Sequence, residues 1–307
     1  MVGFRRLRVI LALKRNYENW ARILWNYALD RPQPFLVIRD GRKLGPLERK
    51  SNSLPFALNP LLDAGWRVDT AVGGCVYLLA RDGLRIKCRY DHGNDLGHLN
   101  EIFVGKVYGS EFNGKIVVDV GMSNGDSSLF FIHMGAEKVI GLEPSRESFD
   151  MAVDNIKSNG MQDKSYLLNS ALFAVAAETS LFESSSNPGV NSLEPVSHMK
   201  SRFNYDTKEN VKTIEIKQLI ESLGLEKIDL LKMDCEGCEY GVFRTISREN
   251  LAIVREIVVE FHDGPQDLVQ ILETNGFEVS LAYNRDFGNR LGYLKARRRL
   301  RPTQEDL

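Results

Sequence analysis

Short apolar runs rich in β-branched residues alternate with segments of helical spacing through most of residues 114–299. The clearest runs are Ile116–Val120, Val139–Leu142, Ile228–Met233 and Glu256–Phe261. Runs of this kind, separated by helices, are typical of parallel strands buried on both faces. Glycine and cap residues predict helices over 125–135 and 145–159. Residues 164–168 are predicted to form a further strand. The pattern therefore predicts an α/β fold with a doubly wound, mostly parallel sheet.

The first 113 residues follow a different pattern. Apolar residues recur at four-three spacing, which predicts one helix face: Leu13, Tyr17, Trp20, Leu24 and Tyr27. The stretches 75–80 and 84–90 alternate like strands around Asp82-Gly83, which predicts a hairpin. We expect three parts: an N-terminal α+β extension over 1–113, the sheet domain over 114–299, and a polar tail over 300–307.

A glycine turn follows the first of these strands. The turn reads Gly121-Met-Ser-Asn-Gly125, with Asp119 and Asp126 on either side, and the next strand ends at Glu143. In open α/β sheets, ligands bind over the carboxyl ends of such strands, where a carboxylate can hold a ribose diol. The turn lacks the G-x-G-x-x-G spacing of a dinucleotide site, and carboxylates suit a cationic ligand. The sequence therefore predicts S-adenosylmethionine in preference to NAD, with a cofactor-free glycine turn as the structural alternative.

A second polar group is predicted at the same edge. Asp234 follows the apolar run Ile228–Met233, and Glu236 and Glu239 come directly after it. Glu260 and His262 end the strand that begins at Glu256. Because parallel strands present their carboxyl ends together, these side chains should meet the glycine turn in one crevice.

These motifs resemble the FkbM family of S-adenosylmethionine-dependent methyltransferases. The family pattern D-x-G-A-N-x-G-D, then E-P, then L-L-K-x-D-x-E-G-x-E, then E-x-H is matched over roughly residues 95 to 282. One departure is Met122-Ser123 in place of Ala-Asn. The resemblance implies a Rossmann-like class I methyltransferase fold and O-methylation of a hydroxyl on a small molecule, sugar or glycolipid. The alternative is a cofactor-binding or scaffold module without catalysis. The replacement of Ala-Asn by Met122-Ser123 is the only feature of the sequence that favours this alternative.

The predicted chemistry is direct displacement, which needs an aligned nucleophile and a base for its proton. His262 is the first candidate base because imidazole titrates near neutral pH, although a structural hydrogen bond explains it equally well. Asp234 is the second candidate, and Glu236 is a candidate orienting group. A divalent metal held by Asp234, Glu260 and His262 is possible but not favoured.

Further candidate contacts follow from the same fold. Ser123 in the turn, and Asn169 and Ala171 after the strand 164–168, are expected to contact the cofactor, the latter two near its adenine. The stretch 183–194 interrupts the strand–helix rhythm, and we interpret it as a substrate-facing lid with Asn187 and Asn191 as polar contacts.

Composition adds few constraints. The net charge is -1 and 43% of residues are hydrophobic, so nothing indicates nucleic acid as a partner.

No apolar run is long enough to cross a bilayer, and the start lacks the features of a signal peptide, so we expect a cytoplasmic protein. Four cysteines are too few for a disulfide framework. Cys235 and Cys238 form a C-x-x-C, which we interpret as small fillers, with a redox pair or half a zinc site as the alternative. Basic residues near both ends are expected to be solvated tails, with peripheral membrane contact as the alternative. Neither the acceptor nor the oligomeric state can be read from the sequence.

Overall fold

The computed structural model describes residues 2–45, 53–80, 82–90, 94–184, 187–195, 197–284 and 289–299. The chain forms two compact units. Unit 1 comprises Met1–Gly109 with Ser186–Gly189, and unit 2 comprises Ser110–Ser185 with Val190–Leu307. The predicted polar tail over 300–307 lies outside the described residues.

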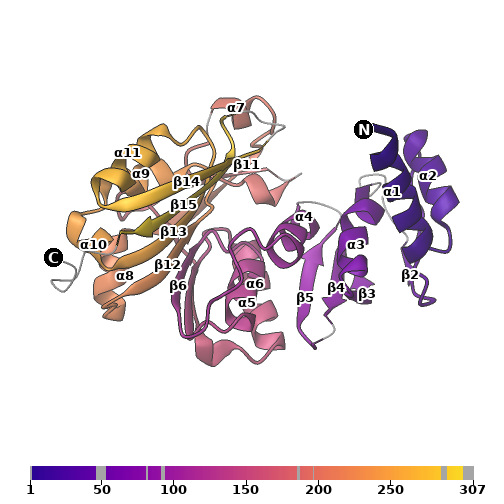
Figure 1. Ribbon diagram of the computed structural model, residues 1–307, viewed down its shortest axis with the longest axis horizontal. Helices are drawn as coiled ribbons and strands as arrows, with labels where there is room; N and C mark the ends of the chain where they lie inside the picture. The colour runs from indigo at the N-terminus through magenta and orange to yellow at the C-terminus, as the bar shows by residue number, and fades with distance from the viewer. Residues whose placement is uncertain are drawn as a thin grey trace, which may run out of the picture. The chain divides into compact units, whose positions relative to one another are not determined.

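Unit 2 is built on a sheet of seven strands (Figure 1). The strand order is β14-β15-β13-β12-β6-β7-β8, in which β15 runs antiparallel to both neighbours and the other pairs are parallel. This mostly parallel arrangement confirms the predicted α/β fold. The strands are β6 (Ile116–Val120), β7 (Lys138–Leu142), β8 (Ser165–Leu168), β12 (Ile228–Met233), β13 (Val254–Phe261), β14 (Phe277–Tyr283) and β15 (Gly292–Arg298).

Helices lie on both sides of this sheet (Figure 1). The first side carries α5 (Asp126–His133) and α6 (Arg146–Ser158), close to the predicted bounds. The second side carries α8 (Ile216–Leu223), α9 (Cys238–Thr245), α10 (Arg248–Ala252) and α11 (Gln266–Thr274). Their apolar side chains share one core with β12 and β13, in which every residue of β12 is buried. Such a strand has no solvent face, which is why its sequence is nearly continuous in apolar residues.

Unit 2 also contains a small sheet of order β10-β11-β9. Its strands are β9 (Ala171–Leu172), β10 (Glu178–Glu183) and β11 (Thr207–Ile214), and the 3-10 helix η3 (Gln162–Lys164) precedes β8. Between β10 and β11 lie the 3-10 helix η4 (Pro188–Val190) and the short helix α7 (Ser197–Lys200). Phe182 in β10 forms an isolated antiparallel bridge with Ser192, which follows η4.

Unit 1 combines helices with two small sheets. Its elements are α1 (Val2–Asn16), α2 (Trp20–Ala28), β1 (Leu36–Val37), β2 (Lys43–Leu44), α3 (Leu54–Asp63), β3 (Arg67–Val72), β4 (Cys75–Leu79), β5 (Arg85–Arg89), α4 (Asp95–Leu99) and the π-helix η2 (Asn100–Val104). The predicted hairpin is confirmed by the antiparallel pair β4–β5. The single predicted helix face is wrong, because the chain breaks between α1 and α2 at Tyr17. Leu13 and Tyr17 are fully buried, whereas Tyr27 is 56% exposed.

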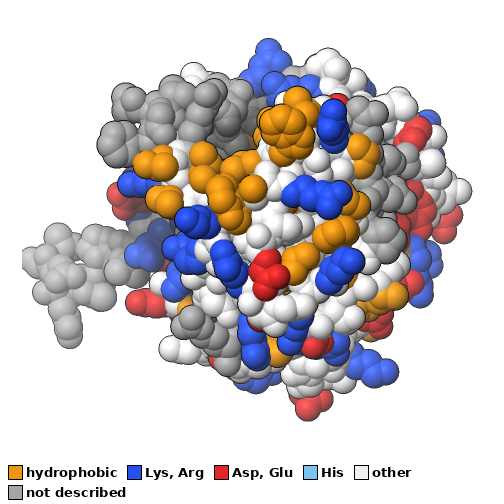
Figure 2. Space-filling model, turned by 90° about the vertical axis from the view of Figure 1, so that its right-hand side faces the viewer, with side chains coloured by type: hydrophobic (Ala, Val, Ile, Leu, Met, Phe, Trp, Pro, Cys, Tyr) orange, Lys and Arg blue, Asp and Glu red, His pale blue; other side chains and the backbone are white. Residues whose placement is uncertain are grey.

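The α1 and α2 helices leave apolar side chains in solvent. Figure 2 shows a face on which hydrophobic side chains lie among lysines and arginines. The exposed apolar residues on or next to these helices are Leu7, Val9, Leu11, Trp25, Tyr27 and Leu29. Membrane contact at the N-terminus stays a prediction, and none of the described helices is long and apolar enough to cross a bilayer. The predicted basic tail at the other end is wrong as far as residue 298, because Arg297 and Arg298 belong to β15 and bond to Glu256 and to backbone carbonyls.

Candidate active site

A buried ion pair fixes the glycine turn to the central strand. The β6–β12 register places Lys232 beside Asp119, and Nζ lies 3.1 Å from Oδ1. The same ammonium donates to the Gly121 carbonyl at 2.7 Å. Ser127 and Ser128 each donate a hydroxyl to Asp119 Oδ2 at 2.7 Å. Asp119, which we predicted to contact the cofactor, is fully buried and bonds only to protein groups that the structure describes. Its side chain therefore supports the turn from the protein interior.

The charge state of Lys232 follows from these neighbours. Burial alone favours the neutral amine, but the carboxylates of Asp119 and Asp234 outweigh that effect and raise the pKa of Lys232 above its ordinary value. Lys232 is therefore a permanent cation, and its charge neutralises Asp119. The negative charge available to a ligand must come from other carboxylates.

The turn requires glycine at both ends, as predicted. Gly121 and Gly125 have φ values of 74° and 83°, in the left-handed region that side chains disfavour. A Cβ on Gly121 would lie 1.8 Å from the carbonyl oxygen of Asp234, and one on Gly125 would lie 3.0 Å from Ala152. The close approach that glycine permits is therefore between the turn and its own neighbours, β12 and α6. The cofactor turn and the end of β12 form one tightly packed piece.

The residues inside the turn divide between core and ligand side. Met122 is fully buried, which explains how a large apolar residue replaces alanine. Ser123 has a positive φ of 47°, and its backbone N–H donates to Glu143 Oε2 at 3.0 Å. Asn124 is fully buried and its side-chain oxygen accepts from the Asp126 N–H. Asp126 itself is 3% exposed and begins α5.

Glu143 lies at the carboxyl end of β7, where the sequence placed it. Its Oε1 accepts from the Ser145 N–H at 2.9 Å while Oε2 holds Ser123. A carboxylate has about four acceptor sites, so ribose hydroxyls can share these oxygens. Asn169 donates to the carbonyls of Glu143 and Pro144, which ties the segment after β8 to the end of β7. Ala171 is buried in β9, so only its backbone is suited to a cofactor contact.

His262 follows β13 and lies between two carboxylates. Its Nδ1 is 3.1 Å from Glu239 Oε1, and its Nε2 is 3.3 Å from Glu236 Oε2. Glu239 Oε2 also accepts the Gly237 N–H, which fixes the carboxylate in place. The exposed side-chain fractions of His262, Glu239 and Glu236 are 3%, 0% and 17%. We predicted Glu236 as the orienting group, whereas Glu239 is more enclosed and its carboxylate is better fixed for that role.

The two carboxylates control the protonation of His262. Burial favours the neutral ring, but Glu236 and Glu239 outweigh it and raise the pKa of His262 well above its ordinary value. The neutral ring, once formed, is a stronger base than a free imidazole. Glu236 has a left-handed φ of 56°, a conformation that costs a side chain energy and recurs at functional sites.

Tyr205 and Ser192 complete this side of the site, and sequence reasoning missed both. The Tyr205 hydroxyl is a buried atom without a hydrogen-bond partner in the described part of the chain, and it lies near Glu236, whose Oε2 faces His262 Nε2 at 3.3 Å. Burial and the nearby Glu236 carboxylate raise the pKa of Tyr205 to about 12, so this hydroxyl stays protonated and can donate. Ser192 donates to the Glu236 carbonyl at 2.5 Å. Neither residue lies in a motif. Ser192 falls in the predicted irregular stretch 183–194, whereas Tyr205 lies beyond it and no sequence signal pointed to it.

The side chains of the two predicted lid residues bond to backbone groups close to them in the chain. Asn191 Oδ1 accepts from the Ser184 N–H, and Asn187 Oδ1 accepts from the Gly189 N–H. Both side chains therefore stabilise local backbone, whereas Ser192 of the same stretch bonds to the Glu236 carbonyl.

Among the residues that the structure describes, two groups of side chains have metal-ligand chemistry. Asp234, Glu236 and His262 offer atoms within 4.8 Å of one another, a set that suits a hard divalent cation. Glu260, which we named as a ligand, is not in this group, because the turn after β12 brings Glu236 to that place. The second group is Cys235, Cys238 and Glu239. The two cysteines are joined by a disulfide, so their interpretation as simple fillers is wrong, and as disulfide sulfurs they are poor ligands.

Comparison with known proteins agrees with this geometry. The family model of the methyltransferase FkbM domain matches residues 119–295. Methyltransferase sdnD of Sordaria araneosa is 26% identical over 196 residues, which cover 55% of this chain and 75% of that protein. Methyltransferase 1 of Beauveria bassiana is 33% identical over 75 residues, which cover 22% of this chain and 30% of that protein.

Solved structures show only distant likeness. A conserved hypothetical protein of Streptococcus pyogenes is 14% identical with a TM-score of 0.41, covering 65% of this chain and 95% of that one. Magnesium protoporphyrin IX methyltransferase of Synechocystis, solved with bound SAM, is 14% identical with a TM-score of 0.37, covering 66% and 79%. Likeness at this level says nothing about a substrate. The family model, in contrast, spans more than half of the chain, from Asp119 in the turn to Lys295 in β15, and the chain therefore belongs to the FkbM-domain methyltransferases.

Proposed function

We propose that this methyltransferase uses S-adenosylmethionine to methylate a hydroxyl on a small molecule, sugar or glycolipid. The observation that carries the proposal is the His262 group, an enclosed base between two carboxylates. This group lies at the carboxyl end of β13, next to β12, and the end of β12 packs directly against the glycine turn. The cofactor turn follows β6 and the base follows β13, and the end of β12 lies between them at one edge of the sheet.

The residues of the turn fit S-adenosylmethionine. With Asp119 neutralised by Lys232, Glu143 and Asp234 are the carboxylates at these strand ends. Glu143 suits the ribose hydroxyls, and negative charge at both positions suits the ammonium and sulfonium groups better than a pyrophosphate. When bound, this cofactor supplies an electrophilic methyl group.

The protein must then align the hydroxyl and accept its proton. Glu239 holds the Nδ1–H of neutral His262, which leaves the Nε2 lone pair facing the Glu236 side. The acceptor hydroxyl gives its proton to Nε2, and the two carboxylates stabilise the imidazolium that forms. The Tyr205 hydroxyl can donate a hydrogen bond to the acceptor and so orient it. Asp234 is the second candidate for the proton and lies on the cofactor side.

The direct test is calorimetry of the full chain with S-adenosylmethionine and S-adenosylhomocysteine, and with NAD as the control. We expect micromolar affinity for the sulfur compounds, on the order of -8 kcal/mol. Glu143→Ala should weaken this binding, whereas His262→Gln should retain it and lose turnover. Preferential binding of NAD would refute the cofactor assignment. Turnover on any hydroxyl acceptor would eliminate a purely scaffolding role.

A further inference from the structure

The helices α1 and α2 of unit 1 each expose a pair of apolar side chains four residues apart. The pair on α1 is Leu7 and Leu11, and the pair at the end of α2 is Trp25 and Leu29. These four residues, which we call the α1/α2 face, are between 46% and 62% exposed. Residues four positions apart are neighbours on a helix surface, so each pair forms one continuous apolar patch.

Both pairs lie on the side of their helix that points away from the core of unit 1. Successive helix residues are about 100° apart, so a residue two positions away lies nearly opposite. On α1, Leu13 lies two positions after Leu11 and is fully buried. On α2, Ile23 lies two positions before Trp25 and is likewise buried. Figure 2 views the side on which α1 and α2 lie in Figure 1, and it shows hydrophobic side chains among lysines and arginines there.

The segment that carries this face is strongly positive. Residues 1–45 contain ten lysines and arginines against three acidic residues, a net charge of +7. The whole chain has a net charge of -1, so the remaining residues carry -8. Lys14 follows Leu11 by three positions and Arg22 precedes Trp25 by three, and both cations are exposed. Positive charge therefore lies directly beside both apolar pairs.

We propose that the α1/α2 face docks onto an anionic membrane surface. Leucine and tryptophan side chains flanked by cations suit the boundary between anionic headgroups and acyl chains. A second copy of this face would bring like charges together, which disfavours a dimer. A nucleic acid would attract the cations but leave the apolar pairs in water. Docking here requires neither the cofactor nor His262, so it stands independently of the proposed function.

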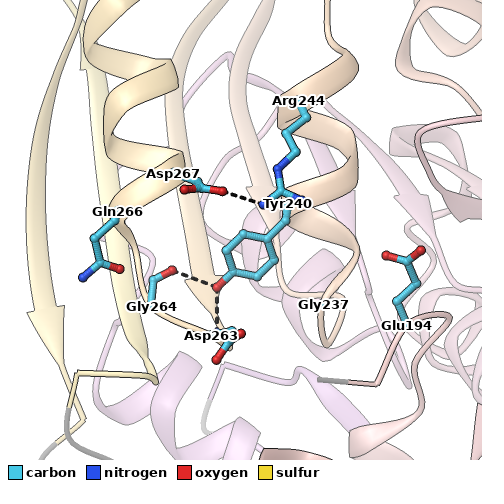
Figure 3. Close-up of a pocket in the computed structure, with 8 residues that line it drawn as sticks. All are labelled: Glu194, Gly237, Tyr240, Arg244, Asp263, Gly264, Gln266 and Asp267. Atoms are coloured by element: carbon cyan, nitrogen blue, oxygen red, sulfur yellow. Dashed lines mark hydrogen bonds and ion pairs between the residues drawn. The ribbon is translucent and has the colours of Figure 1, made fainter. Parts of the chain in front are cut away.

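The pocket of unit 2 has a different character (Figure 3). Its lining consists of polar and charged residues, two glycines and Tyr240. Arg244 is paired with Asp267, and the Tyr240 hydroxyl donates to the Gly264 carbonyl. An acyl chain would find no patch of leucine and tryptophan there, and we assign the lipid contact to unit 1 for that reason.

The test uses the full chain with large vesicles of phosphatidylcholine, either alone or mixed with phosphatidylserine. Sedimentation with the vesicles measures the partition coefficient. Tryptophan emission is the second readout and should move to shorter wavelength as the exposed Trp25 leaves water. We expect binding to the mixed vesicles, weak binding to phosphatidylcholine alone, and a loss of binding as salt is added.

One variant removes the apolar contact. Trp25→Ser/Leu29→Ser should lower the partition coefficient on mixed vesicles by at least about tenfold, because two large side chains no longer leave water. Val175→Ser is the matched control, since Val175 is 59% exposed but belongs to unit 2, and it should change nothing.

A second variant removes charge. Arg8→Gln/Lys14→Gln should lower the same coefficient by about fivefold per cation, the worth of one basic residue near an anionic surface. Lys157→Gln/Lys217→Gln, which changes two exposed helix lysines of unit 2, is the control and should have no effect. All these side chains are exposed, so circular dichroism should show folded variants.

Several results would overturn the proposal. Absence of binding to the mixed vesicles, or equal binding to both kinds of vesicle, would show that no anionic surface is recognised. Unchanged binding by Trp25→Ser/Leu29→Ser would place the contact elsewhere. A dimer in analytical ultracentrifugation that this variant dissociates would assign the face to a second copy of the chain. Release from the vesicles by duplex DNA would assign the cations to a nucleic acid.

Discussion

The buried Lys232–Asp119 pair makes a stability prediction that can be worked from its contacts. Lys232→Met would leave the Asp119 carboxylate at 0% exposure with only the two serine hydroxyls as partners. Removing one member of a buried ion pair costs about 3–5 kcal/mol. The lost charged hydrogen bond to the Gly121 carbonyl is part of that cost and is not added to it. Since whole domains are stable by only about 5–15 kcal/mol, we expect a large loss.

The assay must report on unit 2 alone. All three tryptophans, Trp20, Trp25 and Trp66, belong to unit 1. Their fluorescence therefore reports the unfolding of unit 1, which Lys232→Met should leave unchanged, and it serves as an internal control. Hydrogen exchange of the β12 amides during a urea titration reports the affected core. Lys217→Met, which breaks an exposed pair on α8, should cost no more than about 0.5 kcal/mol.

A second variant separates charge from packing. Asp119→Leu combined with Lys232→Met replaces the pair by apolar side chains, a change that in other proteins is often neutral or stabilising. We therefore expect the double variant to recover most of the loss. A cost below about 1 kcal/mol for Lys232→Met alone, or a double variant no more stable than the single one, would refute the reasoning.

Four further predictions concern the site. Gly121→Ala should abolish S-adenosylmethionine binding in calorimetry, whereas Gly224→Ala, also at positive φ but in open space, should bind normally at a cost of about 1–2 kcal/mol in stability. Turnover should rise with pH through the raised pKa of His262, Glu236→Gln should shift that profile to lower pH, and His262→Gln should lower kcat by about 10²–10⁴-fold. Because the folded-state pKa is raised, the stability that His262 contributes is complete below pH 6.5 and falls as pH rises through that pKa, so denaturation should become easier as turnover increases. Full turnover in a chelator is expected, and its loss with restoration by magnesium would instead assign Asp234, Glu236 and His262 to a metal.

The sheet and the cofactor turn could be predicted because their signals are local. A strand buried on both faces is mostly apolar, as β12 is apart from Asp229 and Lys232, and a left-handed turn favours glycine, as at Gly121 and Gly125. The strand ends then meet at one edge by topology alone. Glu143 and His262 could be placed for that reason.

Partners that depend on tertiary packing could not be predicted. Asp119 reads as a ligand carboxylate in sequence, and only the β6–β12 register shows that Lys232 neutralises it. The orienting role of Glu239 depends on how α9 begins, and the place of Tyr205 depends on a segment without periodicity. The break at Tyr17 is similar, because a continuous apolar spacing does not reveal that the residue pairs with Ile38.

The irregular segment between β10 and β11 has a consequence for engineering. Ser192 and Tyr205 approach Glu236 and His262 from outside the seven-stranded sheet, whereas Gly121 and Lys232 lock the cofactor turn inside it. Part of the surroundings of the proposed base is thus encoded by a stretch of chain separate from the cofactor turn. Grafting residues 190–206 from another member of the family should therefore transfer acceptor preference and leave the affinity for the methyl donor unchanged.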